Sequence, residues 1–297
     1  MNTKEILKAI EKWAAQFEAD IDKLEKGLTG RVEKLQTELL KQLAAILEWL
    51  EFDGKRLKNS PKNMAKLRRL EGVWSKFERE LMDKELALFA EELLKVGQLT
   101  IGYYEATGLI KSDAVKRVVE TLREVIGIDV DGKLLAGGYL DRLGKTAEVR
   151  QQLRDYVLQS IVSKRSLGDF RNGLGDLVVG NDATDGALQR FWRQYAFDTY
   201  NQVHEVANKT IADGLGLKYF IYQGSVIENT RQFCRVKAGK VFSTEEAERW
   251  KDDPDLIDKK TKAQYNPLLE RGRYNCRHFL NYISESVAVE LRPDLKK

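Results

Sequence analysis

One feature constrains this chain more than any other: the 192 residues from Lys62 to Asp253 contain no proline. Proline disrupts helices more strongly than any other residue, so a proline-free stretch of this length favours helix. The chain is 42% hydrophobic and 32% charged, which is typical of a globular protein and not of a disordered one. We therefore expect a mainly α N-terminal region, and a change of character is expected only near the C-terminus.

Apolar residues recur every three or four positions from Leu7 to Leu50, the pattern of one face of a long helix. We expect this helix to run from about Thr3 to Trp49 and to stop before Gly54. Its apolar face needs a cover. A second helix that begins at Ser60 and Pro61 and runs to about Gly97 would cover it as a helical hairpin, because serine caps a helix start and proline fits the first turn. Coiled-coil pairing with another chain is the alternative.

Further helices are indicated by apolar periodicity over 112–127, 146–163 and 185–213. A turn-rich segment, 128–144, and a glycine-spaced stretch, 166–180, lie between them and are not expected to be helical. We divide the chain into a long-helix hairpin that serves as an anchoring region (1–110), a helical region (111–215) and a small α+β domain (216–297).

The composition changes after Gly216. The segment 217–226 is rich in aromatic and β-branched residues, which predicts a strand. A short strand is expected around Val241 and a last strand over 273–283. Ser243 precedes a pair of acids, as helix N-caps often do, and predicts a short helix to Trp250. The C-terminal part is therefore expected to be α+β.

The charge distribution says more than the net charge of +4. The segment 54–70 contains no acid and seven bases. These bases are Lys55, Arg56, Lys58, Lys62, Lys66, Arg68 and Arg69. They form either a solvated loop and helix start, or a patch that contacts DNA phosphates or an acidic partner without sequence specificity. The start of the chain lacks the apolar core of a signal peptide, and no segment is apolar enough to span a membrane.

The two cysteines, Cys234 and Cys276, are too few for a disulfide-rich scaffold, which favours an intracellular product. If the predicted strands pair, both thiols come within reach of His278. A zinc site, a disulfide, and buried reduced thiols beside His278 all stay open. A structural zinc site takes four ligands, and only His204 remains as a further nitrogen donor. We therefore favour reduced thiols and expect no cofactor.

No sequence motif of a known catalytic site is present: the chain has no G-x-S-x-G, H-E-x-x-H, P-loop or dinucleotide-binding pattern. A cysteine–histidine pair is the only nucleophilic arrangement that two cysteines and two histidines allow. We expect a protein without catalytic activity.

The C-terminal half carries an ordered set of short motifs: a long helix, a strand, T-R-x-x-C, G-K-V-F and a closing N-C-R-H. In this order and spacing, the segment 160–283 resembles the phage head morphogenesis family, the minor head proteins of the phage Mu F type. We call the residues that carry this resemblance, together with the histidine beside them, the motif cluster. They are Thr230, Arg231, Cys234, Gly239, Phe242, Asn275, Cys276, Arg277 and His278.

The resemblance implies a structural minor head protein of a tailed bacteriophage, made in the host cytoplasm and retained in the virion. Its implied place is the head interior or the portal vertex. The implied partners are the portal protein and other head proteins, with several copies per particle, and packaged DNA through the basic patches; no membrane is implied. The alternative is a DNA-binding or toxin-like effector that is packaged in the head.

Overall fold

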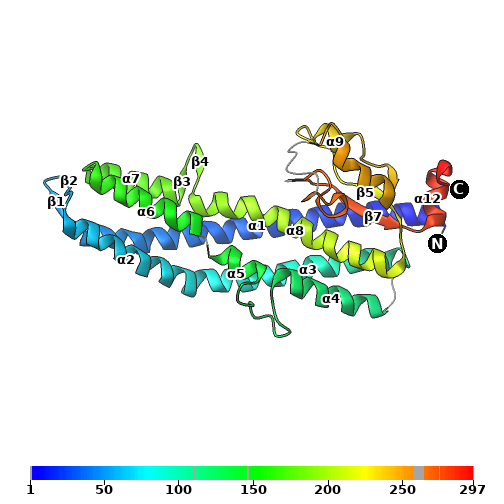
Figure 1. Ribbon diagram of the computed structural model, residues 1–297, viewed down its shortest axis with the longest axis horizontal. Coiled ribbons are helices and arrows are strands. Elements are labelled where there is room, and N and C mark those ends of the chain that lie inside the picture. Colours follow the sequence, from blue (N-terminus) through cyan, green and yellow to red (C-terminus); the bar gives the residue numbers. More distant parts are fainter. Residues whose placement is uncertain (1, 110–111, 146, 257–263, 274, 297) are drawn as a thin grey trace. The chain divides into compact units, whose positions relative to one another are not determined.

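The computed structural model describes residues 2–296 except 110–111, 146, 257–263 and 274 (Figure 1). Its fold is mainly α, with a small antiparallel sheet near the C-terminus, as expected. Helix α1 spans Thr3–Trp49, the range predicted from the apolar stripe. Helix α2 spans Pro61–Phe77, and the Ser60 side chain accepts a hydrogen bond from the Asn63 N–H, which is the predicted N-cap.

Contacts divide the chain into two compact units, each assembled from segments that are far apart in the sequence. The first unit comprises Met1–Leu24, Glu91–Val130 and Phe197–Lys297, and the second comprises Glu25–Ala90 and Asp131–Ala196. These units differ from the three consecutive ranges expected above. The physical reason is helix length: α1, for example, has 47 residues and contributes to both units.

In the second unit, α1 is antiparallel to the helix that follows it. The Glu51 N–H donates to Asn63 Oδ1 at 2.8 Å, while Arg31 Nε lies 2.8 Å from Glu85 Oε2. A π-helical turn, Glu78–Met82, joins α2 to α3. The other elements of this unit are β1 (Phe52–Asp53), β2 (Arg56–Leu57), α5 (Tyr139–Gly144), α6 (Ala147–Val162), α7 (Leu167–Val178), β3 (Gly180–Asn181) and β4 (Thr184–Asp185). Leu43, Trp74 and Phe77 are fully buried in its core.

The first unit holds a sheet of three antiparallel strands in the order β6–β5–β7. Tyr219 at the start of β5 pairs with Ser243 of β6 and with Ile283 of β7. The predicted helix after Ser243 is present and begins with a full capping box. The bounds of these elements are β5 Tyr219–Gln223, α9 Gln232–Arg235, β6 Val241–Ser243, α10 Thr244–Glu248, α11 Pro267–Glu270, β7 Phe279–Ile283 and α12 Glu285–Leu291.

Two aromatic clusters form the core of the first unit. In one, the rings of Trp13 and Phe17 on α1 pack against His204 of α8 (Ala187–Leu215) and Phe279 of β7. In the other, Trp250 is surrounded by edge-to-face contacts with Phe220, Tyr222, Phe233 and Phe242. The first 24 residues are therefore part of the core around the sheet, and not a separate anchor that projects from it.

Four expectations about helices and strands are wrong. The turn-rich segment 128–144 contains a helix, α5, over Tyr139–Gly144, because Leu140 and Leu143 are buried there. Helix α3 (Asp83–Ala106) does not end at Gly97; a Cβ there would lie 2.2 Å from Leu122 Cδ1, so the glycine permits close packing on α4 (Ser112–Ile126). The glycine-spaced stretch is largely helix α7, because Ser166 caps it and its residues 170, 174 and 178 bury one face. The last strand begins only at Phe279, so Cys276 and His278 precede it.

Candidate functional site

Three residues of the motif cluster, Cys234, Cys276 and His278, come from two turns that meet beside the sheet. Cys234 lies in the short helix α9, which begins directly after Arg231. Cys276 and His278 lie in the irregular segment before β7. Positive backbone φ angles at Arg273 (66°) and Asn275 (54°) turn this segment back on itself, which a straight strand could not do. Tight turns, and not the predicted strand, therefore present the two side chains.

The two thiols and the imidazole form one buried cluster. The Sγ atoms of Cys234 and Cys276 are 3.8 Å apart, and both cysteines are free thiols. A ring nitrogen of His278 completes a set of three ligand atoms that lie within 4.8 Å of one another. The predicted approach of Cys234 to Cys276 and His278 is confirmed. The remaining candidate, His204, is not part of this cluster.

Tyr222 of β5 contacts both thiols and the imidazole, and the sequence analysis missed it. Its hydroxyl donates to Cys234 Sγ at 3.3 Å and lies 3.7 Å from Cys276 Sγ. Its ring stacks on the imidazole of His278, with centroids 5.1 Å apart. The sequence gives no sign of this role, since an aromatic residue in a strand is usually part of the core.

The environment makes the two thiols unequal. The pKa of Cys276 is lowered, because the Cys234 thiol hydrogen-bonds to it and His278 stabilises its anion, although burial acts in the opposite direction. The pKa of Cys234 is raised by its hydrogen bond with Cys276 and by burial.

Gly272 closes the gap between the two turns, and the sequence analysis did not identify it. A Cβ at this position would lie 2.4 Å from Cys234 Sγ and 3.1 Å from Cys276 Sγ, so only glycine fits. The Arg231 guanidinium donates to the Gly272 carbonyl at 2.8 Å. Arg231 therefore fixes the distance between the T-R-x-x-C element and the segment that carries Cys276.

The other motif residues also have packing or hydrogen-bonding roles. Thr230 Oγ1 accepts from the Ile227 N–H, and Gly239, with φ of 75°, donates its N–H to the Tyr222 carbonyl. Phe242 packs on Trp250. The Asn275 N–H donates to Asp198 Oδ1 at 2.8 Å, while burial raises the pKa of that carboxyl. The Gly239 and Asn275 contacts hold the two turns to β5 and to α8, whereas the Thr230 hydrogen bond closes a local turn.

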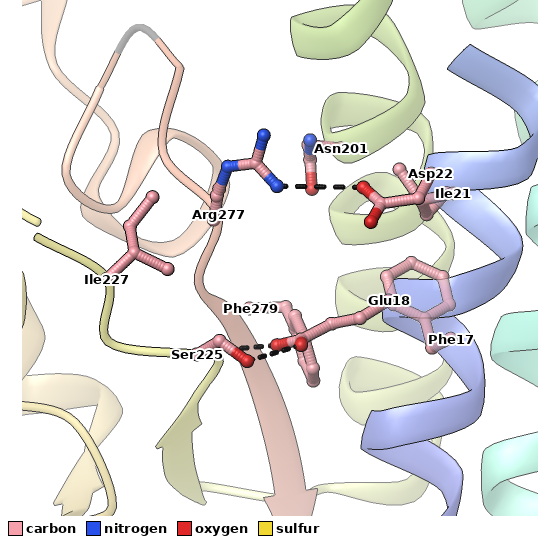
Figure 2. A pocket seen from close by; sticks show the side chains of 9 residues that line it. All are labelled: Phe17, Glu18, Ile21, Asp22, Asn201, Ser225, Ile227, Arg277 and Phe279. Atoms are coloured by element: carbon pink, nitrogen blue, oxygen red, sulfur yellow. Dashed lines mark hydrogen bonds and ion pairs between the residues drawn. The ribbon is translucent and has the colours of Figure 1, made fainter. Parts of the chain in front are cut away.

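Arg277 faces a different feature, a pocket of about 220 Å³ beside α1 (Figure 2). Its guanidinium lies 3.6 Å from Asp22 Oδ1, and Glu18 accepts hydrogen bonds from the backbone N–H and hydroxyl of Ser225. Both carboxylates project from α1, so they connect that helix to the loops around the sheet. The pocket is lined by Phe17, Glu18, Ile21, Asp22, Asn201, Ser225, Ile227, Arg277 and Phe279.

A buried ion pair supports the motif segment from the α8 side. Arg271 Nη1 lies 2.8 Å from Glu205 Oε1, and the same carboxylate accepts the Leu280 N–H at 3.1 Å. Burial raises the pKa of Glu205 to about 7, against the lowering effect of Arg271. The neighbouring His204 hydrogen-bonds Thr100, and burial lowers its pKa. Periodicity alone could not reveal this pair, because it does not show which charged residues are buried.

The basic residues of 54–70 lie in the second unit, around the β1–β2 turn and the start of α2. Lys66 is half-buried and the other six are exposed. Lys62 Nζ lies 3.5 Å from Glu51 Oε1, and the Arg69 guanidinium sits over the Trp49 ring. A second basic run near Cys234 comprises Arg231, Arg235, Lys237 and Lys240. Lys237 is buried and ion-pairs with Asp253, whereas Arg235 and Lys240 are exposed. The first run forms the larger open basic surface, because six of its seven bases are exposed.

Among the described residues, no helix combines the length and apolar character that crossing a bilayer requires. Comparison of the chain with protein-family models, with curated proteins and with solved structures finds no match.

Proposed function

We propose that this protein is a structural minor head protein of a tailed bacteriophage, without catalytic activity, that acts in head morphogenesis and stays in the virion. The observation that carries the proposal is the convergence of the motif cluster. Two elements 42 residues apart meet with their thiols at 3.8 Å, and Arg231 joins them through the Gly272 carbonyl. The motif, which recurs in this order in the resembling family, would then serve to hold these two elements together.

The side-chain environments favour a structural role over catalysis. Cys234 and Cys276 are 2% and 3% exposed, so a substrate could reach either sulfur only after the turns had moved apart. Arg231, Thr230 and Phe242 are engaged in hydrogen bonds and packing. A nucleophile, in contrast, needs an open path to its target.

The proposed partners are the portal protein and other head proteins, and several copies would be present at the portal vertex or inside the head. The surface around the Arg277 pocket supports docking of this kind, because apolar and charged side chains line the pocket together. Packaged DNA is a further partner, through the exposed basic residues near the start of α2.

Protein content of purified particles tests the proposal. The phage or induced prophage that encodes this chain is purified by density-gradient centrifugation, and the protein is quantified against the portal protein by mass spectrometry. We expect a fixed ratio to the portal in full heads and in empty heads. Absence from particles that contain portal would overturn the proposal.

The second candidate is a DNA-binding or toxin-like effector that is packaged in the head. The exposed bases of 54–70 favour it, since they are available to bind phosphates. An effector would leave the particle with the DNA, so its ratio to the portal would fall on ejection. A structural subunit that is retained in the head would keep its ratio.

A further inference from the structure

We propose that Cys234, Cys276 and His278 bind one zinc ion, which clamps α9 to the segment before β7. This inference goes beyond the proposed function and does not depend on it. The distance between the sulfur atoms is the first observation that carries it. Two thiolates that bind one tetrahedral zinc ion, each about 2.3 Å from the metal, are about 3.8 Å apart. The Sγ atoms of Cys234 and Cys276 are 3.8 Å apart.

Burial is the second observation. The three residues are 2–3% exposed. Among the described residues, they form the group of cysteine, histidine and acidic side chains whose ligand atoms lie close enough together to hold a metal ion. The Nε2 atom of His278 is buried and has no hydrogen-bond partner within the described part of the chain. Buried polar atoms are almost always paired, so groups that are left partly unsatisfied point to a missing ligand.

The neighbouring residues hold the two sulfur atoms in place before any metal binds. Gly272 leaves room for both sulfur atoms where any side chain would collide with them. Arg231 holds the Gly272 carbonyl, and the Tyr222 hydroxyl donates to Cys234 Sγ. Hydrogen bonds of this kind orient the ligands of a metal and stabilise thiolate charge.

The donor set selects the metal. Two thiolates and one imidazole are soft ligands that suit zinc, whereas calcium and magnesium take oxygen ligands. Two thiolates also neutralise the 2+ charge of zinc, so the filled site buries no net charge. Loss of two thiol protons accompanies binding. The three protein ligands leave a fourth position beside the Tyr222 hydroxyl, which lies 3.3 and 3.7 Å from the two sulfur atoms.

A disulfide is the competing state of the same atoms. Its sulfur atoms would be about 2.05 Å apart. Formation of this bond oxidises both thiols and needs an external oxidant, whereas zinc fits the sulfur separation already present. The two states are chemically distinct, because zinc-bound cysteines are released as free thiols by a chelator and disulfide-bonded cysteines are not.

The test uses the full-length protein, purified under reducing conditions, with Co²⁺ as a spectroscopic probe. We expect one zinc per chain by elemental mass spectrometry. Replacement of zinc by Co²⁺ should give the visible absorption of tetrahedral, thiolate-bound cobalt, and one equivalent of Zn²⁺ should abolish it. Cys234→Ser, Cys276→Ser and His278→Gln should each lose most of the bound zinc. Arg277→Gln, between two of the ligands in the sequence, should keep it.

If the cysteine variants do not fold, the wild-type protein still decides the question. Both thiols should be unreactive in the native protein and should become reactive when a chelator is added, with a lower Tm. The inference is overturned if the reduced native protein, after incubation with Zn²⁺ and desalting, retains less than a tenth of an equivalent of zinc. A disulfide in the freshly purified protein would overturn it as well. Neither result bears on whether the protein enters phage heads.

Discussion

At the scale of single residues, Gly272 is a position where even one added methyl group should be costly. The Cβ of Gly272→Ala would lie 2.4 Å from Cys234 Sγ, so the two turns must separate. We expect the free energy of unfolding, measured by urea denaturation, to fall by about 1–3 kcal/mol. Gly30→Ala is the matched control, because a Cβ there meets nothing within 4 Å inside α1. It should stabilise the protein by about 0.5–1 kcal/mol. Equal effects of the two substitutions would mean that the close approach at Gly272 is unimportant.

Glu205 gives a prediction about pH. Burial raises the pKa of Glu205 from 4.5 to about 7 in the folded state, so its protonated form favours folding. The stability it contributes is fully present below pH 4.5 and is lost as the pH rises to about 7. We therefore expect the unfolding free energy of the wild type, minus that of Glu205→Gln, to decrease as the pH rises over this interval. Urea denaturation at a series of pH values measures it.

The exposed residue Glu33 provides the control for the Glu205 experiment. Glu33→Gln removes one carboxyl from the surface of α1, so it controls for the loss of one negative charge outside the core. A difference for Glu205→Gln that is flat, or that rises with pH, would show that burial does not dominate the titration of Glu205.

At the scale of elements, the π-helical turn Glu78–Met82 makes a specific prediction. A π turn holds one residue more than an α turn, so removing one residue there can restore regular helix without changing the faces of α2 and α3. Deletion of Glu80, which is exposed, should cost less than about 2 kcal/mol. The result is read from the Tm and the circular dichroism spectrum.

Deletion of exposed Glu91 is the matched control for the π turn, since it lies within regular α-helix. That deletion rotates the rest of α3 by about 100° and removes its apolar face from the core. We expect it to abolish cooperative unfolding. If deletion of Glu80 is as damaging as deletion of Glu91, the extra residue of the π turn is required by the fold.

Local signals predicted most of the elements. The stripe from Leu7 to Leu50 predicted both ends of α1, and the Ser60 cap predicted the start of α2. Each of these signals depends only on residues that are close in the sequence. Helix α7 was missed because its glycines outweighed the cap at Ser166 and the spacing of its buried residues. Propensity is a weak guide where an apolar face is buried.

The candidate site was predicted in part. The approach of Cys234 to Cys276 followed from motif order. The predicted local backbone was wrong, since left-handed residues at 273 and 275 place Cys276 and His278 after tight turns and not on a strand. Tyr222, Gly272 and the Glu205–Arg271 pair could not be found in advance. Their roles depend on contacts between segments that are 12 to 75 residues apart.

At the scale of the whole molecule, the exposed bases of 54–70 predict salt-dependent DNA binding. The triple variant Lys55→Gln, Arg56→Gln and Lys58→Gln should weaken binding to duplex DNA of any sequence. If each base contacts one phosphate, the slope of log K against log salt should fall by about 2.7. Fluorescence anisotropy at several salt concentrations measures both quantities.

The control for DNA binding has the same change in net charge. It combines Lys8→Gln, Lys12→Gln and Lys116→Gln, which alter exposed lysines outside the basic segment. For this variant, the slope of log K against log salt should be nearly as steep as for the wild type. If both triple variants lose the same amount, DNA responds to the net charge of the protein, and the segment 54–70 is not a binding patch.

The packing of Phe17 on Phe279 has a consequence for how the chain is made. The first helix leaves the ribosome with an apolar face whose cover, the last strand, is synthesised about 260 residues later. At roughly 5–20 residues per second, this interval lasts roughly 13–52 s. During that time the nascent helix is a target for chaperones. The first unit can therefore close around α1 only after β7 has left the ribosome, although α1 is made long before it.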